Sequence, residues 1–147
     1  MVHNHRIHEV FSLFFSSLAD REEPTLAHCA SGEGRTGVAV ALLQDILGVS
    51  WCDIQTEYCL TNKAGNREVH YDQVLPGIRK RHPNIDAVGL NALVSVDRSY
   101  LQAAFDSIRE RYGSIAKYLE EVLNVDAAMR ASLERRFLVS GPLSPEA

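Results

Sequence analysis

The stretch His28–Gly37, HCASGEGRTG, carries the strongest structural and chemical signal in this chain. Five residues separate Cys29 from Arg35, and they include two glycines and a serine. After the arginine, residues 36–47 are apolar almost all round, which predicts a buried helix. Before the loop, the short apolar run TLAHC at residues 25–29 predicts a β-strand. The stretch therefore predicts a strand, a loop and a buried helix, in that order.

A loop of this kind can bind an anion. Gly32 and Gly34 tolerate unusual backbone dihedrals, so the N–H groups of residues 30–35 can curl inward. The N-terminus of the helix that follows attracts negative charge, and the Arg35 guanidinium matches two phosphate oxygens. The same positive environment favours the thiolate form of Cys29. A thiolate beneath a bound phosphate is a nucleophile in line with phosphorus.

The neighbours of the loop extend this chemistry. The Thr36 hydroxyl can hydrogen-bond the thiolate or help it to leave from a phosphocysteine, and Gly37 follows at once. We expect His28 to orient the loop by hydrogen bonding rather than to act as a base. The alternative is a glycine-rich turn around a packing cysteine, but such a turn would not need an arginine aimed at it.

Composition places the chain among ordinary globular proteins. It has 147 residues, of which 46% are hydrophobic and 23% charged, so we expect one domain over residues 1–147. The net charge of −4 favours neither nucleic acid nor an anionic membrane. We expect no membrane span and no signal peptide. Three cysteines argue against a disulfide framework and for a reducing, cytoplasmic location.

The rest of the chain predicts mainly helices. Helical periodicity and capping residues predict the helices that begin and end at the following places: residues 7–18; a helix capped by Ser50 after Gly48; 67–81, followed by a loop through 81–89; Asp97 to Gly113; Ser114 to Asn124; and one that starts after Asp126. Residues 63–95 are expected to form a variable insertion or lid, and residues 138–147 a loose tail. We interpret the basic run IRKR at residues 78–81 as a solvated helix face, with a substrate-facing role as the weaker alternative.

With these residues in view, HCASGEGRTG resembles the phosphate-binding loop of the cysteine-dependent protein tyrosine phosphatases. The surrounding segments, LADREEPTLAHCASGEGRTGVAVALLQDILGVSWCDIQTEYCLTN and YLQAAFDSIRERYGSIAKYLEEVLNVDAAMRASLERRFL, are similar to the bacterial group with atypical, lipid-tolerant members. The resemblance covers most of the chain outside residues 63–95. It implies Cys29 as nucleophile, Arg35 as phosphate clamp and Thr36 as hydroxyl helper. It also implies a backbone cradle made by the loop residues Ala30, Ser31, Gly32, Glu33 and Gly34, with no cofactor and no metal.

The loop departs from that group at two residues. Glu33-Gly34 stands where the group commonly has Lys-Asp, of which the lysine is associated with phosphoinositides and the aspartate with acid–base help. Glu33 puts a negative charge beside the anion site, so we expect little activity on multiply phosphorylated inositides. The general acid is not identified. Asp20 lies at a polar break, and a Glu33 held ionised beside Arg35 is a poor acid.

The predicted sheet is incomplete. Only one strand is convincing, and a lone strand leaves both edges unpaired. The chain therefore resembles the C-terminal half of an α/β tyrosine phosphatase fold: helix-dominated, with the strand–loop–helix core and a C-terminal helical bundle. Residues not recognised as strands, a second copy of the chain in a homo-oligomer, or a complementary segment missing from it would complete the sheet.

Three functions are weighed. The leading hypothesis is hydrolysis of a phosphotyrosine protein, or of another aryl phosphate, through a phosphocysteine, because an aryl leaving group needs least help from an acid. The alternative is a catalytically weak or inactive relative that binds phosphate or phosphotyrosine. Oxidation of Cys29 would be a side property. The histidines of HNHRIH at residues 3–8 do not form a fixed ligand set, so we expect a frayed terminus there rather than a metal site.

Overall fold

The computed structural model describes residues 1–30, 32–63 and 67–138, and within these ranges all regular structure is helical. In chain order the elements are α1 (His5–Asp20), α2 (Gly34–Ile46), α3 (Trp51–Leu60), α4 (Arg67–Arg81), α5 (Ala87–Leu93), α6 (Arg98–Tyr112), α7 (Ile115–Lys117), the π-helix η1 (Tyr118–Val122) and α8 (Ala127–Phe137). The helix-dominated character predicted from the sequence is confirmed.

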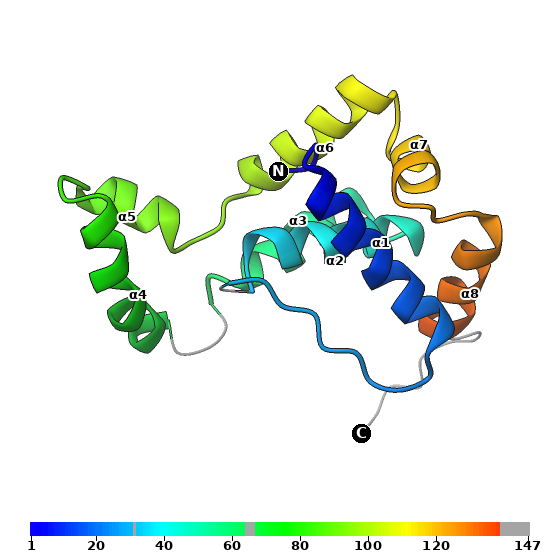
Figure 1. The fold of residues 1–147 in the computed structure, drawn as a ribbon, viewed down its shortest axis with the longest axis horizontal. Coiled ribbons are helices and arrows are strands. Elements are labelled where there is room, and N and C mark those ends of the chain that lie inside the picture. The colour runs from blue at the N-terminus through cyan, green and yellow to red at the C-terminus, as the bar shows by residue number, and fades with distance from the viewer. Residues whose placement is uncertain (31, 64–66, 139–147) are drawn as a thin grey trace.

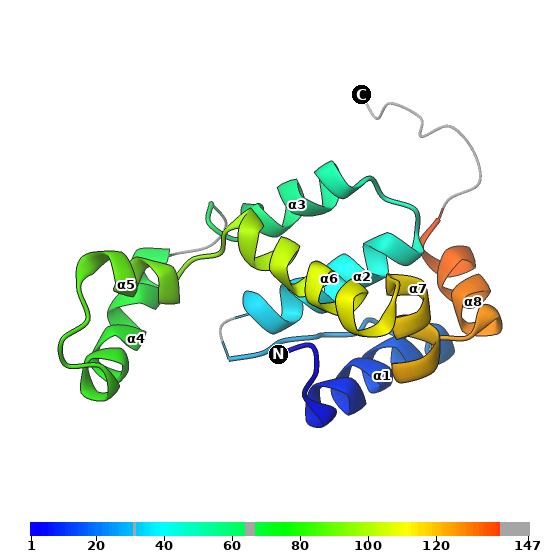
Figure 2. The same cartoon turned by 90° about the horizontal axis from the view of Figure 1, so that it is seen from above.

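Two parts of the molecule are set apart in both ribbon views (Figure 1, Figure 2). The helical body consists of α1, α2, α3, α6, α7, η1 and α8, in which α1 packs on α8 and α2, and α3 packs on α2 and α6. The arm, residues 67–93, consists of α4 and α5 and projects from one end of the body. The core lies in the body, where the largest fully buried side chains are Phe15, Leu42, Ile54, Leu101, Phe105, Ile108, Tyr118, Leu119, Leu123, Val125 and Leu133.

The predicted strand at residues 25–29 does not form. This part of the chain is extended but has no strand partner among the described residues, and the backbone groups of Thr25, Leu26 and Ala27 make no hydrogen bond there. Leu26 is 88% exposed. A strand exists only when a neighbour takes up its backbone N–H and C=O groups, and no described segment does so. The strand–loop–helix core is therefore not supported among the described residues, where the α/β fold predicted from the sequence is represented by helices and an extended segment without a strand partner leads into the loop.

The N-terminus is docked, not frayed. Val2 is buried, and the Tyr118 hydroxyl donates to its carbonyl oxygen at 3.3 Å. His8 Nε2 lies 2.7 Å from the same oxygen, and His3 Nε2 lies 2.7 Å from the Ser107 hydroxyl of α6. The prediction of an exposed terminus is wrong because these histidines hydrogen-bond within the body, a use that local sequence does not reveal.

The end of α1 is held by α8. The last carbonyl groups of a helix lack intrahelical donors. Here the Ser132 hydroxyl donates to the Ala19 carbonyl at 3.0 Å, and the Arg136 guanidinium donates to the carbonyls of Leu18 and Glu23 at 2.5 and 3.0 Å. These bonds fix the point from which the extended segment departs toward the loop.

The helices around the loop agree with the sequence. α2 begins two residues before the predicted start and buries its apolar residues Val38, Ala39, Ala41, Leu42 and Ile46. Gly48 takes a left-handed φ of +75° just past its end. The Ser50 hydroxyl then accepts from the Asp53 N–H at 3.2 Å and caps α3, as predicted.

One hydrogen-bonded pair joins the two segments that connect the arm to the body. The Asn62 side chain donates to the Val96 carbonyl at 2.6 Å and accepts from the Val96 N–H at 3.0 Å. Within the arm the predicted helix 67–81 is confirmed as α4, but the loop predicted through 81–89 is too long. α5 begins at Ala87 because the Asp86 side chain accepts from the Gly89 N–H at 2.7 Å and caps it.

The C-terminal helices have the predicted caps. Asp97, Ser114 and Asp126 cap their helices, and Gly113 and Asn124 take left-handed φ values of +85° and +58°. The one difference lies between two of these caps, where the predicted single helix switches to the wider π-helix η1, closed by a bond from the Leu123 N–H to the Tyr118 carbonyl. Apart from Leu138, the predicted tail 138–147 lies outside the described residues.

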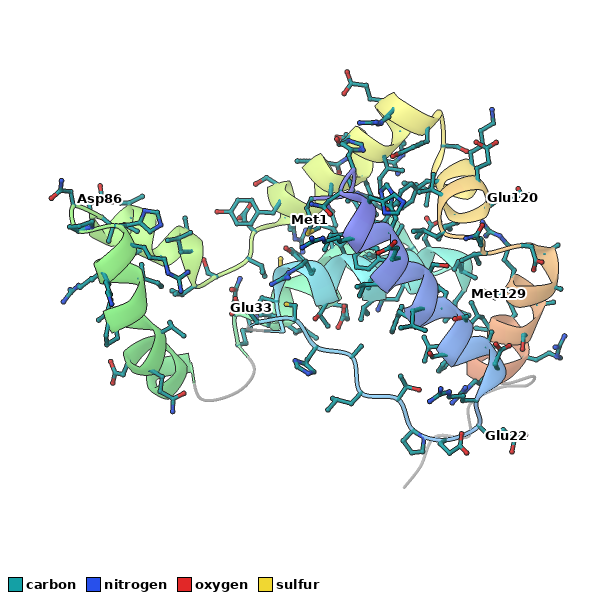
Figure 3. All side chains as sticks on the ribbon, in the orientation of Figure 1. Met1, Glu22, Glu33, Asp86, Glu120 and Met129 are labelled. Atoms are coloured by element: carbon teal, nitrogen blue, oxygen red, sulfur yellow. The ribbon has the colours of Figure 1, made fainter. Side chains whose placement is uncertain are left out.

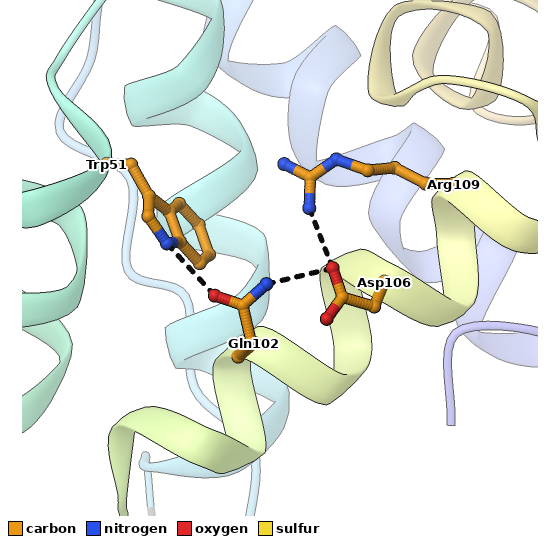
Figure 4. A network of polar contacts seen from close by, with 4 residues as sticks. All are labelled: Trp51, Gln102, Asp106 and Arg109. Carbon is orange, nitrogen blue, oxygen red and sulfur yellow. Dashed lines mark hydrogen bonds and ion pairs between the residues drawn. The ribbon is translucent and has the colours of Figure 1, made fainter.

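Helices α3 and α6 are joined by a polar network (Figure 4). The Trp51 indole N–H donates to Gln102 at 3.1 Å, and the Gln102 amide donates to Asp106 at 2.8 Å. Arg109 completes the network with a 3.1 Å contact to the same Asp106 oxygen, and its guanidinium lies 5.8 Å from the Trp51 ring centre.

No helix among the described residues is long and apolar enough to cross a bilayer.

Candidate active site

The candidate loop lies at the junction of the extended segment and α2. Gly32 takes a left-handed φ of +76°, which a residue without Cβ adopts at low cost. Glu33 is the N-cap of α2, but its side chain makes no capping hydrogen bond. The first-turn N–H groups of α2 are therefore not taken up by a side chain at the cap. Ser31, predicted as part of the cradle, lies outside the described residues.

Cys29, Arg35 and Thr36 line one small hollow of about 130 Å³. Cys29 is half-buried, whereas Arg35 is exposed and makes no hydrogen bond or ion pair with any residue that the structure describes. The guanidinium donors of Arg35 are thus available to a ligand. The fold brings together the three residues that the sequence singled out for catalysis.

Helix α1 forms the other wall of this hollow. Its residues Ile7, Val10, Phe11 and Phe14 line the hollow, and Val10 is 58% exposed. The sequence did not predict that α1 contributes to the site. Its apolar periodicity predicts a helix with one buried face, but it does not indicate which segment that face packs against.

His28 makes a hydrogen bond to the loop backbone. Its Nδ1 lies 3.0 Å from the Cys29 carbonyl oxygen. Because a carbonyl only accepts, the bond requires the proton on Nδ1. The imidazole is thus placed to hold the backbone at Cys29 in one orientation.

Gly37 is required by a close approach between α2 and α3. A Cβ at this position would lie 2.5 and 2.7 Å from two ring carbons of Tyr58, which is nearer than side-chain atoms can come. Burial raises the pKa of Tyr58, and the charges of Cys59 and Glu33 add to the shift, so the phenol stays protonated. Tyr58 was not among the predicted site residues, although its spacing four residues after the buried Ile54 marks the same helix face.

The loop has a second side. Ala30 and Glu33 line a cleft of about 450 Å³ with residues of the arm, among them Arg81 and His82. Glu33 lies at the end of the body that faces the arm (Figure 3). The predicted cradle residues are therefore divided: Cys29 and Arg35 line the hollow beside α1, and Ala30 and Glu33 line the cleft beside the arm.

Among the residues that the structure describes, no carboxylate lines the hollow that holds Cys29. Asp20, the last residue of α1, lines a separate depression of about 830 Å³ formed with the segment after α1. Among the described residues no group of three or more His, Cys, Asp or Glu side chains is placed to hold a metal ion. The polar groups that the described residues supply to the hollow are a thiol, a guanidinium, a hydroxyl and the His28 imidazole.

Comparison with known proteins gives the family. A family model described as "Tyrosine phosphatase family" matches residues 1–139. A Cupriavidus necator protein named "putative tyrosine-protein phosphatase" is 32% identical over 123 residues, which cover 84% of this chain and 43% of that protein. The chain thus spans less than half the length of this relative. Because the family model covers nearly all of its residues, the chain belongs to the tyrosine phosphatase family.

Proposed function

We propose that the chain hydrolyses aryl phosphomonoesters, with a phosphotyrosine protein as substrate, through a phosphocysteine intermediate. The observation that carries the proposal is that Cys29, Arg35 and Thr36 line one hollow at the start of α2, in a chain of the tyrosine phosphatase family. In the Cys-x5-Arg loop the thiolate is the nucleophile, and Arg35 binds two phosphoryl oxygens. The N–H groups of residues 30–34 bind the remaining charge, while His28 and Gly37 hold the loop in place.

The reaction takes place in two steps. The Cys29 thiolate attacks phosphorus, a P–S bond forms, and the P–O bond to the aryl group breaks. The phenolate leaves and takes a proton from water. Water then attacks phosphorus, the P–S bond breaks, and inorganic phosphate departs while the Thr36 hydroxyl stabilises the thiolate by a hydrogen bond. Aryl esters suit this site because none of the described residues that line the hollow is a carboxylic acid that could protonate a poorer leaving group.

We propose a complementary strand for the extended segment. Support comes from the backbone of Thr25, Leu26 and Ala27, which makes no hydrogen bond with any described residue, and from the exposure of Leu26 and Val10. A second copy of the chain or a further segment would pair with this edge and stiffen the approach to the loop.

We also propose that residues 63–95 act as a lid over the loop. We further propose that the protein works in the cytoplasm, where its cysteines stay reduced.

The test is hydrolysis of p-nitrophenyl phosphate by the purified chain. Cys29→Ser is expected to lower the rate by at least about 10³-fold because the nucleophile is lost, and Arg35→Lys by about 10²-fold because the paired donors are lost. The matched control is Cys52→Ser, since Cys52 is exposed on α3 away from the loop and its loss leaves the rate unchanged. A rate that stays flat on the alkaline side indicates that no general acid operates.

Equal rates of p-nitrophenyl phosphate hydrolysis for Cys29→Ser and the unchanged chain would contradict the thiolate mechanism. A specific observation favours one other function, binding without turnover: no carboxylic acid is found among the described residues that line the hollow. That function requires an inactive chain that still binds vanadate, with binding lost in Arg35→Lys.

A further inference from the structure

Two glycines in the first turn of α2 have different surroundings. A Cβ on Gly34 would meet no atom within 4 Å, whereas a Cβ on Gly37 would lie 2.5 Å from Cε2 and 2.7 Å from Cδ2 of the Tyr58 ring. The φ of Gly37 is not left-handed, so its backbone conformation does not require glycine. Gly37 is therefore required for space, because the Tyr58 ring packs directly on the backbone of α2.

This contact falls on the residue that closes the first turn of α2. The Gly37 N–H donates to the Glu33 carbonyl at 2.8 Å, and the turn between these two residues contains Arg35 and Thr36. The Glu33 side chain makes no capping hydrogen bond, so the turn lacks the support that an N-cap side chain usually gives. The ring that packs on Gly37 supports the turn from the side instead.

The Tyr58 ring is itself held in place. Tyr58 is buried in the core, one turn after the buried Ile54 on the same face of α3. A close-packed interior leaves a large ring little room to move. Burial raises the pKa of Tyr58, with smaller contributions from the charges of Cys59 and Glu33, so the phenol adds no negative charge near the loop. The turn thus rests on a rigid, neutral ring.

We propose that Tyr58 is a positioning residue: its ring, packed on Gly37, holds the first turn of α2 so that Arg35 and Thr36 stay at the hollow that Cys29 lines. The proposal rests on the proposed function, since it assumes that the phosphoryl group binds at these residues. Tyr58 is not among the residues that line the hollow, so it acts through Gly37 rather than by contact with the substrate. The ring carries this role, and the hydroxyl group has no part in it.

The first experiment compares substitutions in α3 by the kinetics of p-nitrophenyl phosphate hydrolysis, measured well below the unfolding transition. Tyr58→Leu removes the ring, and kcat and kcat/KM should fall together by about 10–100-fold, because a displaced turn weakens binding of the transition state. Tyr58→Phe keeps the ring and should retain both constants within about twofold. Ile54→Ala is the matched control, since it removes buried atoms from the same face of α3 one turn away, and it should also stay within about twofold.

Gly37→Ala is the second variant in case Tyr58→Leu does not fold. It keeps the ring but displaces the turn, so kcat is expected to fall here as well. An unchanged kcat in either folded variant would overturn the proposal. An equal fall in Ile54→Ala would do the same, because it would indicate a general loss of helix packing, and an equal fall in Tyr58→Phe would assign the role to the hydroxyl group.

Amide hydrogen exchange tests the support of the turn without any reaction. In the unchanged chain the Gly37 N–H should exchange at least about 10-fold more slowly than an open amide, although its bond to Glu33 is the first in the helix. Tyr58→Leu should remove this protection relative to the Leu42 amide inside α2, and Tyr58→Phe should keep it. An open Gly37 amide in the unchanged chain, or equal protection in Tyr58→Leu, would refute the proposal.

Together the two experiments separate this proposal from the catalytic one. An inactive chain in which Tyr58→Leu still removes the protection of Gly37 would refute the catalytic proposal and support the role of the ring. Activity that is lost in Cys29→Ser but is equal in Tyr58→Leu and Tyr58→Phe would support the catalytic proposal and refute the role of the ring.

Discussion

The helical body and the arm are both helical, but they hold their helices in different ways. In the body, side chains distant in sequence bury one another, and Phe105, Ile108 and Leu133 are fully covered. Among the arm side chains described between residues 72 and 93, Leu90 is the buried one. α4 even contains Pro76, which removes a backbone donor. The arm is thus stabilised mainly by local hydrogen bonds and caps, and the body by tertiary packing.

Capping residues and helical periodicity in the sequence therefore do not indicate how tightly a helix packs against the rest of the molecule. The caps in the two regions are equally good. The Asp86 carboxylate accepts from the backbone N–H of Gly89 in the arm at 2.7 Å, and the Asp126 carboxylate accepts from that of Met129 in the body at 2.8 Å. What separates the regions is apolar burial, which supplies most of the stabilisation of a fold. Because the cleft lies between a rigid part and a weakly anchored part, the position of the arm controls its shape.

The largest effect is expected from breaking the body core. Phe105→Ala should lower the free energy of unfolding by about 3–5 kcal/mol, since it removes a fully buried aromatic ring. Replacing residues 63–95 by a short Gly-Ser linker should change it by less than about 1 kcal/mol, because the Asn62–Val96 bonds already hold the ends together. Urea unfolding measures both.

Phe105→Leu gives a milder core variant in case the alanine variant does not fold. If deleting the arm lowers the free energy of unfolding as much as Phe105→Ala does, the two regions form one cooperative unit. The body would then not be stabilised independently of the arm.

A smaller effect is expected from adding one methyl group to each region. Gly37→Ala forces a Cβ into the Tyr58 ring and should destabilise the body by about 1–3 kcal/mol. Gly77→Ala in α4 meets no atom within 4 Å, and it should stabilise that helix locally by up to about 1 kcal/mol without changing global unfolding. Urea unfolding reports the first change and amide hydrogen exchange the second.

The double variant Gly37→Ala/Tyr58→Leu is the control. It should recover part of the loss if the ring is the cause, and additive losses would show that the helix contact is not the reason for this glycine.

The smallest effect concerns the docked N-terminal edge of the body. Burial lowers the pKa of His3, and the charge of Arg111 lowers it further, with a smaller opposing contribution from Glu110. A histidine whose pKa is lower in the folded than in the unfolded chain favours unfolding once protonated. Above the pKa of this histidine in the unfolded chain, the imidazole is neutral in both states and does not oppose folding. As the pH drops below that pKa, the unfolded chain binds a proton more readily than the folded chain, so the free energy of unfolding falls.

His3→Gln replaces the imidazole by an amide that can hydrogen-bond Ser107 but does not titrate. Urea unfolding at about pH 7.5 and about pH 5.5 should show a smaller loss on acidification in His3→Gln than in the unchanged chain. Equal losses would mean that the docking of His3 does not depend on its charge.

Much of the fold could be predicted because its signals are local. Ser50, Asp97, Ser114 and Asp126 each satisfy an N–H group within three residues, so the sequence contains the whole interaction. The strand at residues 25–29 could not be decided this way, since its existence depends on a partner far away in sequence or in another chain. The docking of His3 on Ser107 has the same character.

For the site, the spacing of Cys29, Arg35 and Thr36 was enough to predict which residues meet, because one loop and one helix turn connect them. The spacing did not predict the wall contributed by α1, the contact of Gly37 with Tyr58, or the cleft of Glu33 and Arg81. Each joins segments that only packing brings together.

The sequence by itself determined most of the helices, the caps at Ser50, Asp97, Ser114 and Asp126, and the composition of the loop, because these depend on residues a few positions apart. The tertiary structure decided that the segment before the loop stays unpaired, that α1 closes one side of the site, and that the arm faces the other. The physical reason is that burial and backbone pairing are satisfied by whichever surfaces meet in space, and a linear pattern does not specify those surfaces.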